Sequence, residues 1–118
     1  METRKKILIQ TGYTDKTIEE LASLIQLGKI KIDKLEEAEL EYDCLNHNPS
    51  ADERTVYPLR FFGKKFEVWV ADVAAGFKGT GPLGAIEILK MFGFDVTDDQ
   101  CKAILGGSKT MFIKFYKN

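Results

Sequence analysis

The sequence predicts an α+β protein, specifically a two-layer sandwich with a mostly antiparallel sheet of about four strands and helices on one face. Three observations lead to this prediction. The 118 residues are 44% hydrophobic, which suits a single domain over residues 1–118. Some segments have the period of two that is typical of strands, and others have the helical period. Their order, β-α-α-β-β-α-(α)-β, separates a strand hairpin from the helices.

The N-terminal part of the chain reads as a strand followed by a helix. Residues 4–10 have an apolar centre and predict a short strand. Residues 14–27 carry apolar side chains at helical spacing. We expect this helix to be capped either by a capping box of Thr17 and Glu20 or by Thr14 instead.

Residues 33–45 predict an acidic amphipathic helix. Its apolar stripe, with spacings of three and four, consists of Leu35, Ala38, Tyr42 and Leu45. The acidic residues around the stripe are Glu36, Glu37, Glu39, Glu41 and Asp43. This face is either a solvated surface or a docking surface for a basic partner.

A β-hairpin follows, with strands at 55–62 and 65–73. Gly63 at the first central position of the Gly63-Lys64 turn predicts a type II′ turn. Pro58 cannot donate a ladder hydrogen bond, which favours a sheet edge or a bulge for the first strand.

The remaining residues predict two helices and a last strand. Pro82 suits the first turn of a central helix, which ends at Gly93. A short helix through Leu105 follows, with Thr97 or Asp98 as its cap. Aromatic and β-branched residues at 110–116 predict the final strand.

A glycine-rich loop before the central helix is the first candidate site, and its residues are Gly76, Phe77, Lys78, Gly79, Thr80 and Gly81. Backbone N–H groups at such a strand-to-helix connection can converge on a phosphate. Lys78 would add charge, the Thr80 hydroxyl a hydrogen bond, and Phe77 a ring that stacks on a base or covers the ligand. The order of the glycines matches neither a P-loop nor a dinucleotide-binding fingerprint. The alternative is that the glycines only permit a tight connection and close packing of Gly84.

Three further residues are candidates for contact with a ligand. In the predicted strand, Trp69 faces away from Val68 and is either a core residue or a stacking platform for a base. Arg60 and Lys109 lie near strand ends and offer positive charge, with solvent exposure as the alternative.

Signals for catalysis are few, and we expect no catalytic residue, no metal and no cofactor. Asp72, at the end of a strand before the glycine loop, is the best-placed acid, but a turn-forming or capping role is favoured. Cys44 and His47 could form a Cys-His pair with a thiolate nucleophile, but nothing nearby in the sequence would orient them.

Charge and composition limit the partners. Residues 1–53 hold 7 basic and 12 acidic residues, whereas residues 54–118 hold 10 basic and 6 acidic ones, so the second half could attract an anion. This excess is too small to predict binding to duplex nucleic acid. No apolar run approaches the roughly 20 residues that span a bilayer, and no cleavable leader is evident. Two cysteines without a scaffold pattern suit a reducing, cytoplasmic location.

We therefore expect a small non-catalytic protein that binds a phosphate-bearing small molecule, such as a nucleotide or nucleotide signal, as a sensor or sequestering protein. The alternative is a protein-interaction factor, such as an inhibitor, immunity-type protein or adaptor, that uses the acidic helix 33–45. Pro58 as an edge marker and the 11% aromatic content also favour homo-oligomerisation.

Overall fold

The computed structural model describes residues 4–43, 53–106 and 110–117, without the side chains of Asp43 and Thr110. The described residues form five strands and four α-helices. In chain order these elements are β1 (Lys5–Ile9), α1 (Thr14–Gln26), β2 (Leu35–Asp43), α2 (Glu53–Val56), β3 (Leu59–Gly63), β4 (Phe66–Val70), α3 (Thr80–Met91), α4 (Asp98–Gly106) and β5 (Thr110–Tyr116). A one-turn 3₁₀ helix, Ile32–Lys34, precedes β2.

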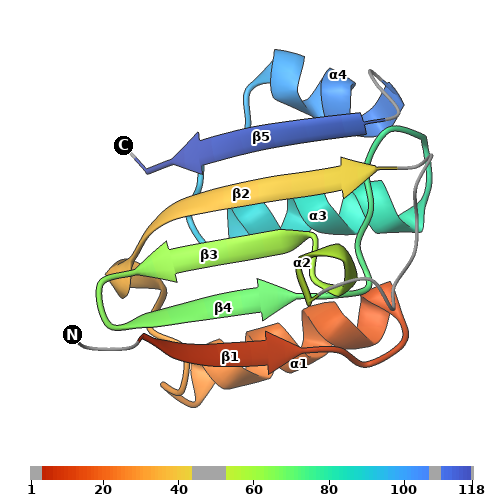
Figure 1. Cartoon of the computed structure of the whole chain (residues 1–118). Coiled ribbons are helices and arrows are strands. Elements are labelled where there is room, and N and C mark those ends of the chain that lie inside the picture. Colours follow the sequence, from red (N-terminus) through yellow and green to blue (C-terminus); the bar gives the residue numbers. More distant parts are fainter. Residues whose placement is uncertain (1–3, 44–52, 107–109, 118) are drawn as a thin grey trace.

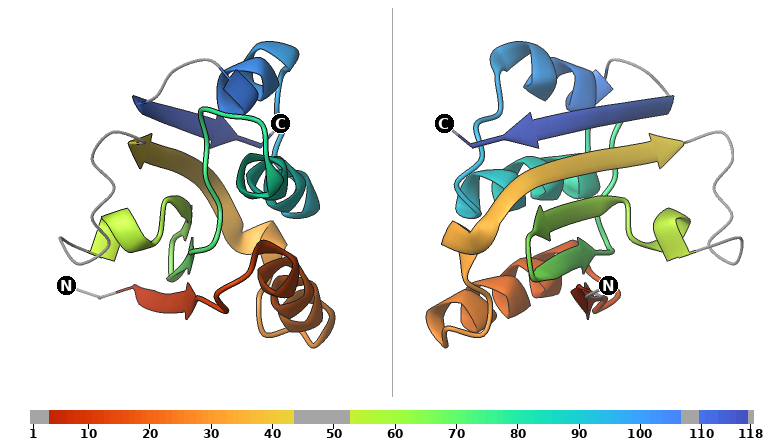
Figure 2. Two further views of the ribbon diagram at one scale, coloured as in Figure 1. Left: turned by 90° about the vertical axis from the view of Figure 1, so that its right-hand side faces the viewer. Right: turned by 60° about the vertical axis from the view of Figure 1, so that its left-hand side comes forward.

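The strands form a single sheet in the order β1-β4-β3-β2-β5 (Figure 1). β1 and β4 are parallel, and the other neighbouring pairs are antiparallel. Helices α1, α3 and α4 lie on one side of the sheet and the short α2 lies on the other (Figure 2). The predicted α+β class is confirmed, but the sheet has five strands instead of about four and is mixed. No helix among the described residues is both long enough and apolar enough to cross a bilayer.

The predicted acidic helix at 33–45 is wrong, because this part of the chain forms strand β2. A β-bulge between Leu35 and Glu37 shifts the alternation by one residue, so that Leu35 and Ala38 are both buried in the core. This offset creates the three-residue spacing that resembles a helix. β3 and β5 pair with β2 on its two sides, and such pairing overrides local helix propensity. Leu45 lies outside the described residues.

The first strand of the hairpin also differs from the prediction. Glu53–Val56 forms α2, so β3 begins only at Leu59. Pro58 precedes β3, which is an interior strand, and therefore does not mark a sheet edge. Its carbonyl still accepts a hydrogen bond from the Glu41 N–H at 2.9 Å. A proline is tolerated here because its missing N–H falls before the ladder begins.

Gly63 is the last residue of β3 and not the first central residue of a type II′ turn. Its φ is not positive, as that turn would require. The sheet needs glycine here for a different reason, since an added Cβ would lie 2.4 Å from the carbonyl oxygen of Lys34. The close approach of another backbone therefore explains this glycine.

The hydrophobic core lies between the sheet and the helices α1, α3 and α4. Phe61 of β3 stacks on Phe92, with ring centroids 4.1 Å apart, and Phe94 adds a tilted ring at 5.5 Å. Leu21 of α1 and Ile104 of α4 have no exposed surface. Because this core uses one side of each strand, the other side of the sheet is available for different chemistry.

The two predicted capping arrangements have different outcomes. Thr97 caps α4, as one of the two predictions has it: the Gln100 N–H donates to Thr97 Oγ1 at 3.1 Å, and the Thr97 N–H donates to Gln100 Oε1 at 2.9 Å. In α1 the predicted Thr14 cap is wrong, because Thr14 is the first helical residue and the N-cap is Tyr13, which makes no side-chain cap. Thr17 is buried inside this helix, so its predicted capping box with Glu20 does not start the helix.

Lys117, directly after β5, contacts the 3₁₀ helix that precedes β2. Its Nζ donates a hydrogen bond to the Ile32 carbonyl and lies 5.0 Å from the centroid of the Phe94 ring. Burial lowers the pKa of Lys117, and the nearby Asp33 carboxylate opposes this shift. The ammonium is thus stabilised by an acceptor and an anion but destabilised by desolvation.

Candidate functional site

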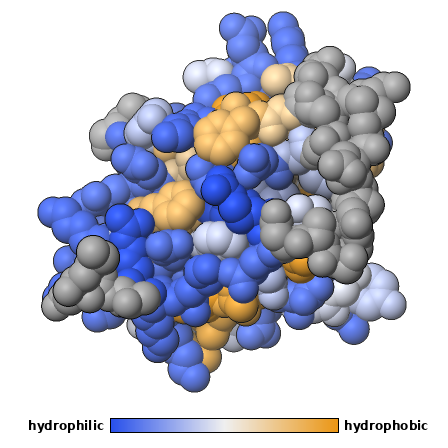
Figure 3. All heavy atoms as spheres, in the orientation of Figure 1, coloured by the Kyte–Doolittle hydropathy of each residue, from blue (hydrophilic) through white to orange (hydrophobic). Residues whose placement is uncertain are grey.

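The side of the sheet opposite α1 and α3, here called the open face, has a continuous cross-strand row. The row takes one residue from each strand in spatial order, namely Leu8, Trp69, Arg60, Glu39 and Lys114. Figure 3 shows that this face is largely hydrophilic, with separate apolar areas between the polar ones. α2 covers only part of it (Figure 1).

Arg60 occupies the centre of this row and has no exposed surface. Its Nε donates to Glu39 Oε1 at 2.8 Å and its Nη2 donates to Glu41 Oε1 at 2.6 Å. Its Nη1 donates to the carbonyls of Arg54 and Tyr57 at 3.1 and 3.2 Å. The predicted alternative of a solvent-exposed Arg60 is therefore wrong, and each guanidinium nitrogen already has a protein partner.

The ion pairs on the open face also hold α2 against the sheet. Arg54 Nη2 lies 3.4 Å from Glu39 Oε1 and 3.2 Å from Glu41 Oε1. At the start of α2, Glu53 Oε1 accepts a hydrogen bond from Lys6 Nζ at 2.6 Å. The network thus connects β1, β2 and β3 through one short helix.

Trp69 points to the open face, as its alternation with Val68 predicts, but it is only 8% exposed. Its Nε1 donates to Glu67 Oε1 at 2.8 Å. Lys6 Nζ lies 3.9 Å from the ring centroid and the Arg60 guanidinium carbon lies 5.3 Å from it. Cations of the protein itself therefore occupy the π surface that a base would need.

Packing and backbone bonds account for two glycines of the predicted phosphate loop. Gly76 has a φ of 95° and donates its N–H to the Ile104 carbonyl at 2.7 Å, so that N–H is not free for an anion. An added Cβ at Gly81 would lie 2.9 Å from Ala74 Cβ. Gly76 thus binds the loop to α4 through a backbone hydrogen bond, and Gly81 permits close packing against Ala74.

The neighbouring glycines are also in contact with other parts of the protein. An added Cβ at Gly84 would lie 2.3 Å from Thr14 Cγ2, so close packing of α3 against α1 requires this glycine. At Gly79 an added Cβ would lie 3.0 Å from the edge of the half-exposed Phe77 ring and 3.9 Å from Pro82 Cδ.

The structure does not bring all the predicted ligand residues together. Lys78 and Thr80 are exposed at the start of α3, which leads to the helix-covered side of the sheet. Trp69 and Arg60 lie on the open face instead. Lys109 lies outside the described residues, as do Cys44 and His47.

Asp72 joins the loop after β4 to the loop after β1. It adopts a φ of 64°, in the left-handed region that Asp tolerates better than most residues. Its Oδ2 accepts hydrogen bonds from the Thr11 N–H at 2.8 Å, the Gly12 N–H at 3.2 Å and the Thr17 hydroxyl at 2.9 Å. The Thr14 hydroxyl donates to the Asp72 carbonyl at 2.6 Å. These contacts agree with the structural role favoured by the sequence.

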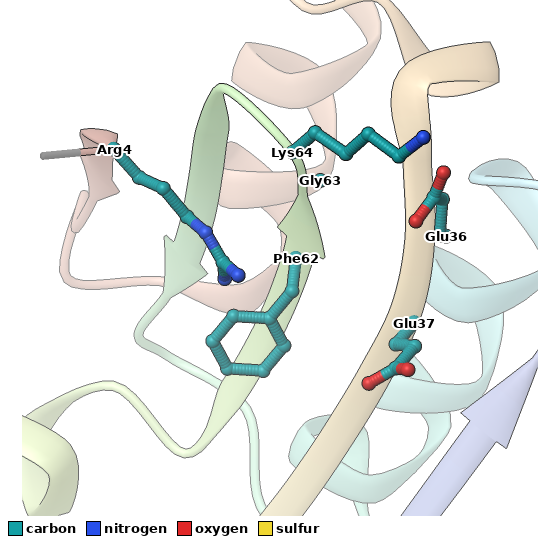
Figure 4. Close-up of a pocket in the computed structure, with 6 residues that line it drawn as sticks. All are labelled: Arg4, Glu36, Glu37, Phe62, Gly63 and Lys64. Atoms are coloured by element: carbon teal, nitrogen blue, oxygen red, sulfur yellow. The ribbon is translucent and has the colours of Figure 1, made fainter. Parts of the chain in front are cut away.

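A hollow of about 290 Å³ lies on the open face beside the β3–β4 turn (Figure 4). It is lined by Arg4, Glu36, Glu37, Phe62, Gly63 and Lys64. The bulge in β2 brings two consecutive carboxylates to this hollow. In Figure 4 the Phe62 ring lies between the Arg4 guanidinium and the Glu37 carboxylate, and the Lys64 side chain extends toward Glu36.

Exposed aromatic residues of β5 lie directly opposite acidic residues of β2. Tyr116 is 57% exposed and pairs with Glu37, and Phe112 is 49% exposed and pairs with Glu41. Glu37 also pairs with Phe62 on its other side, so this carboxylate lies between two rings. Phe62, Phe112 and Tyr116 are not among the site residues predicted from the sequence, although the alternation within 110–116 indicates that Phe112 and Tyr116 share one side of the strand.

The fold and this site define a small α+β protein with one helix-covered sheet face and one partly open face that presents acidic and aromatic side chains. No protein-family model, curated protein or solved structure matches the chain.

Proposed function

We propose that this protein is a protein-interaction factor that docks a basic segment of a partner protein on the open face, at β2, β3 and β5. The observation that carries this proposal is the exposure of Tyr116 directly opposite Glu37. Tyrosine is enriched at interfaces because its ring supplies apolar area and its hydroxyl a hydrogen bond. The acidic surface once expected on a helix lies instead on strand β2.

The charges on this surface favour a cationic partner group. Within the described part of the chain, neither Glu36 nor Glu37 forms an ion pair, whereas Glu39 and Glu41 are both bound by arginines. An arginine or lysine that enters the hollow would contact the Phe62 ring and both free carboxylates. Arg4 and Lys64 line the same hollow, so a basic segment that also contains an acidic residue fits best.

We place this activity in the cytoplasm, where thiols stay reduced. Cys101, the cysteine among the described residues, is a free thiol. A location of this kind also gives access to the basic segments of intracellular partners.

A short arginine-rich peptide is the probe that tests this surface. We expect its addition to shift the amide NMR signals of Glu36, Glu37, Phe62 and Tyr116, with an effect that weakens as salt rises. The double variant Glu36→Gln/Glu37→Gln should bind the peptide about tenfold more weakly, because it removes both free carboxylates.

The matched control is Glu19→Gln/Glu20→Gln, which removes two exposed charges from α1 on the other side of the sheet. It should bind the peptide as the unmodified protein does. Equal weakening by both double variants would show that binding follows net charge and would contradict a defined docking surface.

A second candidate function is the binding of a phosphate-bearing small molecule, such as a nucleotide, at residues 76–81. The observation that favours it is the N-terminus of α3, where Gly79 provides no side-chain cap and the first turn contains no acidic residue. Free N–H groups and the helix dipole attract a phosphate at such a position. Lys78 and Thr80 are exposed next to it, and the N–H of Gly76 is excluded because Ile104 binds it.

Thermal unfolding with mononucleotides, dinucleotides, cyclic nucleotides and inorganic phosphate tests this candidate. A bound ligand at 100 times its dissociation constant should stabilise the fold by about 2.7 kcal/mol. We expect Lys78→Ala to abolish the stabilisation and Lys90→Ala, in the last turn of the same helix, to retain it. The absence of a shift across this panel would eliminate the candidate.

A further inference from the structure

We propose that two copies of this chain pair through the outer edges of their β5 strands, antiparallel and related by a twofold axis, so that the two five-stranded sheets become continuous. The inference is independent of the proposed docking of a basic partner. β5 is at one end of the strand order and pairs only with β2 in the part of the chain that the structure describes. The unpaired side of an edge strand is a template for another strand.

The backbone groups that β5 directs outward can be assigned from its neighbours. The Glu41 N–H bonds to Pro58 on the β3 side, so Glu41 and its partner Phe112 form a non-hydrogen-bonded pair. Phe112 therefore directs its N–H and C=O away from β2, as does every second residue of the strand. Consistently, the Lys114 carbonyl accepts a hydrogen bond from the Gln100 side chain at 3.5 Å. The outward groups thus belong to Thr110, Phe112, Lys114 and Tyr116.

Self-complementarity favours a second copy of this chain and also selects the register. A twofold interface places the same strand on both sides, so each contact occurs twice. If Ile113 lies on the axis, Phe112 of each copy lies opposite Lys114 of the other, and the ammonium can contact the ring. If Lys114 lies on the axis, two lysines face each other, which destabilises the pair. We therefore assign Ile113 to the axis.

The opposite edge of the sheet is less suited to this pairing. β1 has five residues, and its exposed Lys5 places positive charge at the edge, whereas the Lys6 ammonium is directed to Glu53 and the Trp69 ring. Charged side chains, lysine above all, are a common protection of edge strands. β5 has seven residues, and Lys114 is the one charged residue within it. At β5 the weak contact from Gln100 would be replaced by backbone hydrogen bonds.

Cysteine cross-linking of the full chain tests the pairing and its register. Across a non-hydrogen-bonded pair the Cβ atoms of opposed residues are about 4.5–5.5 Å apart, which brings two cysteines close to the distance at which they form a disulfide. In a Cys44→Ser/Cys101→Ser background, we expect Ile113→Cys to form a covalent dimer on mild oxidation. The matched control is Ile7→Cys on β1, which should remain monomeric. Preferential cross-linking of Lys114→Cys would overturn the register.

Sedimentation velocity of the uncross-linked protein tests the dimer itself. Lys114→Pro removes an N–H that points outward and leaves the ladder with β2 intact, so the fold should persist by circular dichroism. We expect this variant to weaken the dimer by roughly tenfold or more, since it removes edge hydrogen bonds and the lysine charge. A wild-type protein that stays monomeric at every concentration would overturn the proposal, as would a dimer that Lys114→Pro leaves unchanged.

Discussion

Replacement of Arg60 by methionine is expected to lower the free energy of unfolding by about 3–5 kcal/mol. The reason is that Arg60 is fully buried and Glu39 nearly so, at 9% exposed. The variant would leave the Glu39 carboxylate desolvated with only the longer contact to Arg54, at 3.4 Å. Urea unfolding followed by circular dichroism measures this change.

Two controls separate the buried pair from surface electrostatics. Arg54→Ala removes a half-exposed guanidinium and should cost less than about 1 kcal/mol. The double variant Arg60→Met/Glu39→Met should be more stable than Arg60→Met alone, because no unpaired buried charge remains. A double variant less stable than the single one would show that the network stabilises the sheet beyond the mutual neutralisation of its charges.

Replacement of Asp72 by alanine is expected to lower the free energy of unfolding by about 3 kcal/mol. Three donors, the N–H groups of Thr11 and Gly12 and the hydroxyl of Thr17, would lose the acceptor that they share. Thr17 has no exposed surface, so water cannot reach its hydroxyl, which would keep only the Thr11 hydroxyl, 2.9 Å away, as a partner. Alanine would also carry the strain of a positive φ. Thermal and urea unfolding of the variant measure the loss.

Asp72→Asn is the matched control, since asparagine retains an acceptor oxygen and tolerates the left-handed conformation. It should cost about 1 kcal/mol, the difference between a charged and a neutral acceptor. An equal loss in both variants would assign the effect to the negative charge and not to the hydrogen bonds. The comparison matters for function because Asp72 is the acid that a catalytic interpretation would use first.

Elements with local signals were predictable from the sequence. β1, α1, α4 and β5 form close to their expected positions, because periodicity, caps and β-branched residues act over a few neighbouring residues. The side of the strand on which Trp69 lies followed from alternation alone. The same alternation within β5 contains the exposed Phe112 and Tyr116, although these were not recognised as surface residues.

The errors arose where contacts between distant parts of the chain decide the conformation. The acidic residues of 33–45 favour a helix locally, but two neighbouring strands supply hydrogen-bond partners along both edges of β2. Glycine is typical of turns, but at position 63 it is required for another reason: any side chain would collide with the Lys34 carbonyl, which belongs to another element. Arginine is typical of protein surfaces, but Arg60 is buried, and its hydrogen bonds to two carboxylates and two carbonyls compensate the cost of desolvation.

By itself the sequence determined the α+β class and the location of most helices and strands, because these depend on composition and short-range periodicity. Only the tertiary structure decided which side of the sheet remains open, which glycines are needed for packing, and which charges are left without partners. Those properties depend on contacts between residues that are far apart in the chain, such as Thr14 with Gly84 and Glu37 with Tyr116. The energy of such contacts arises only when folding brings their members together, so no local pattern encodes them.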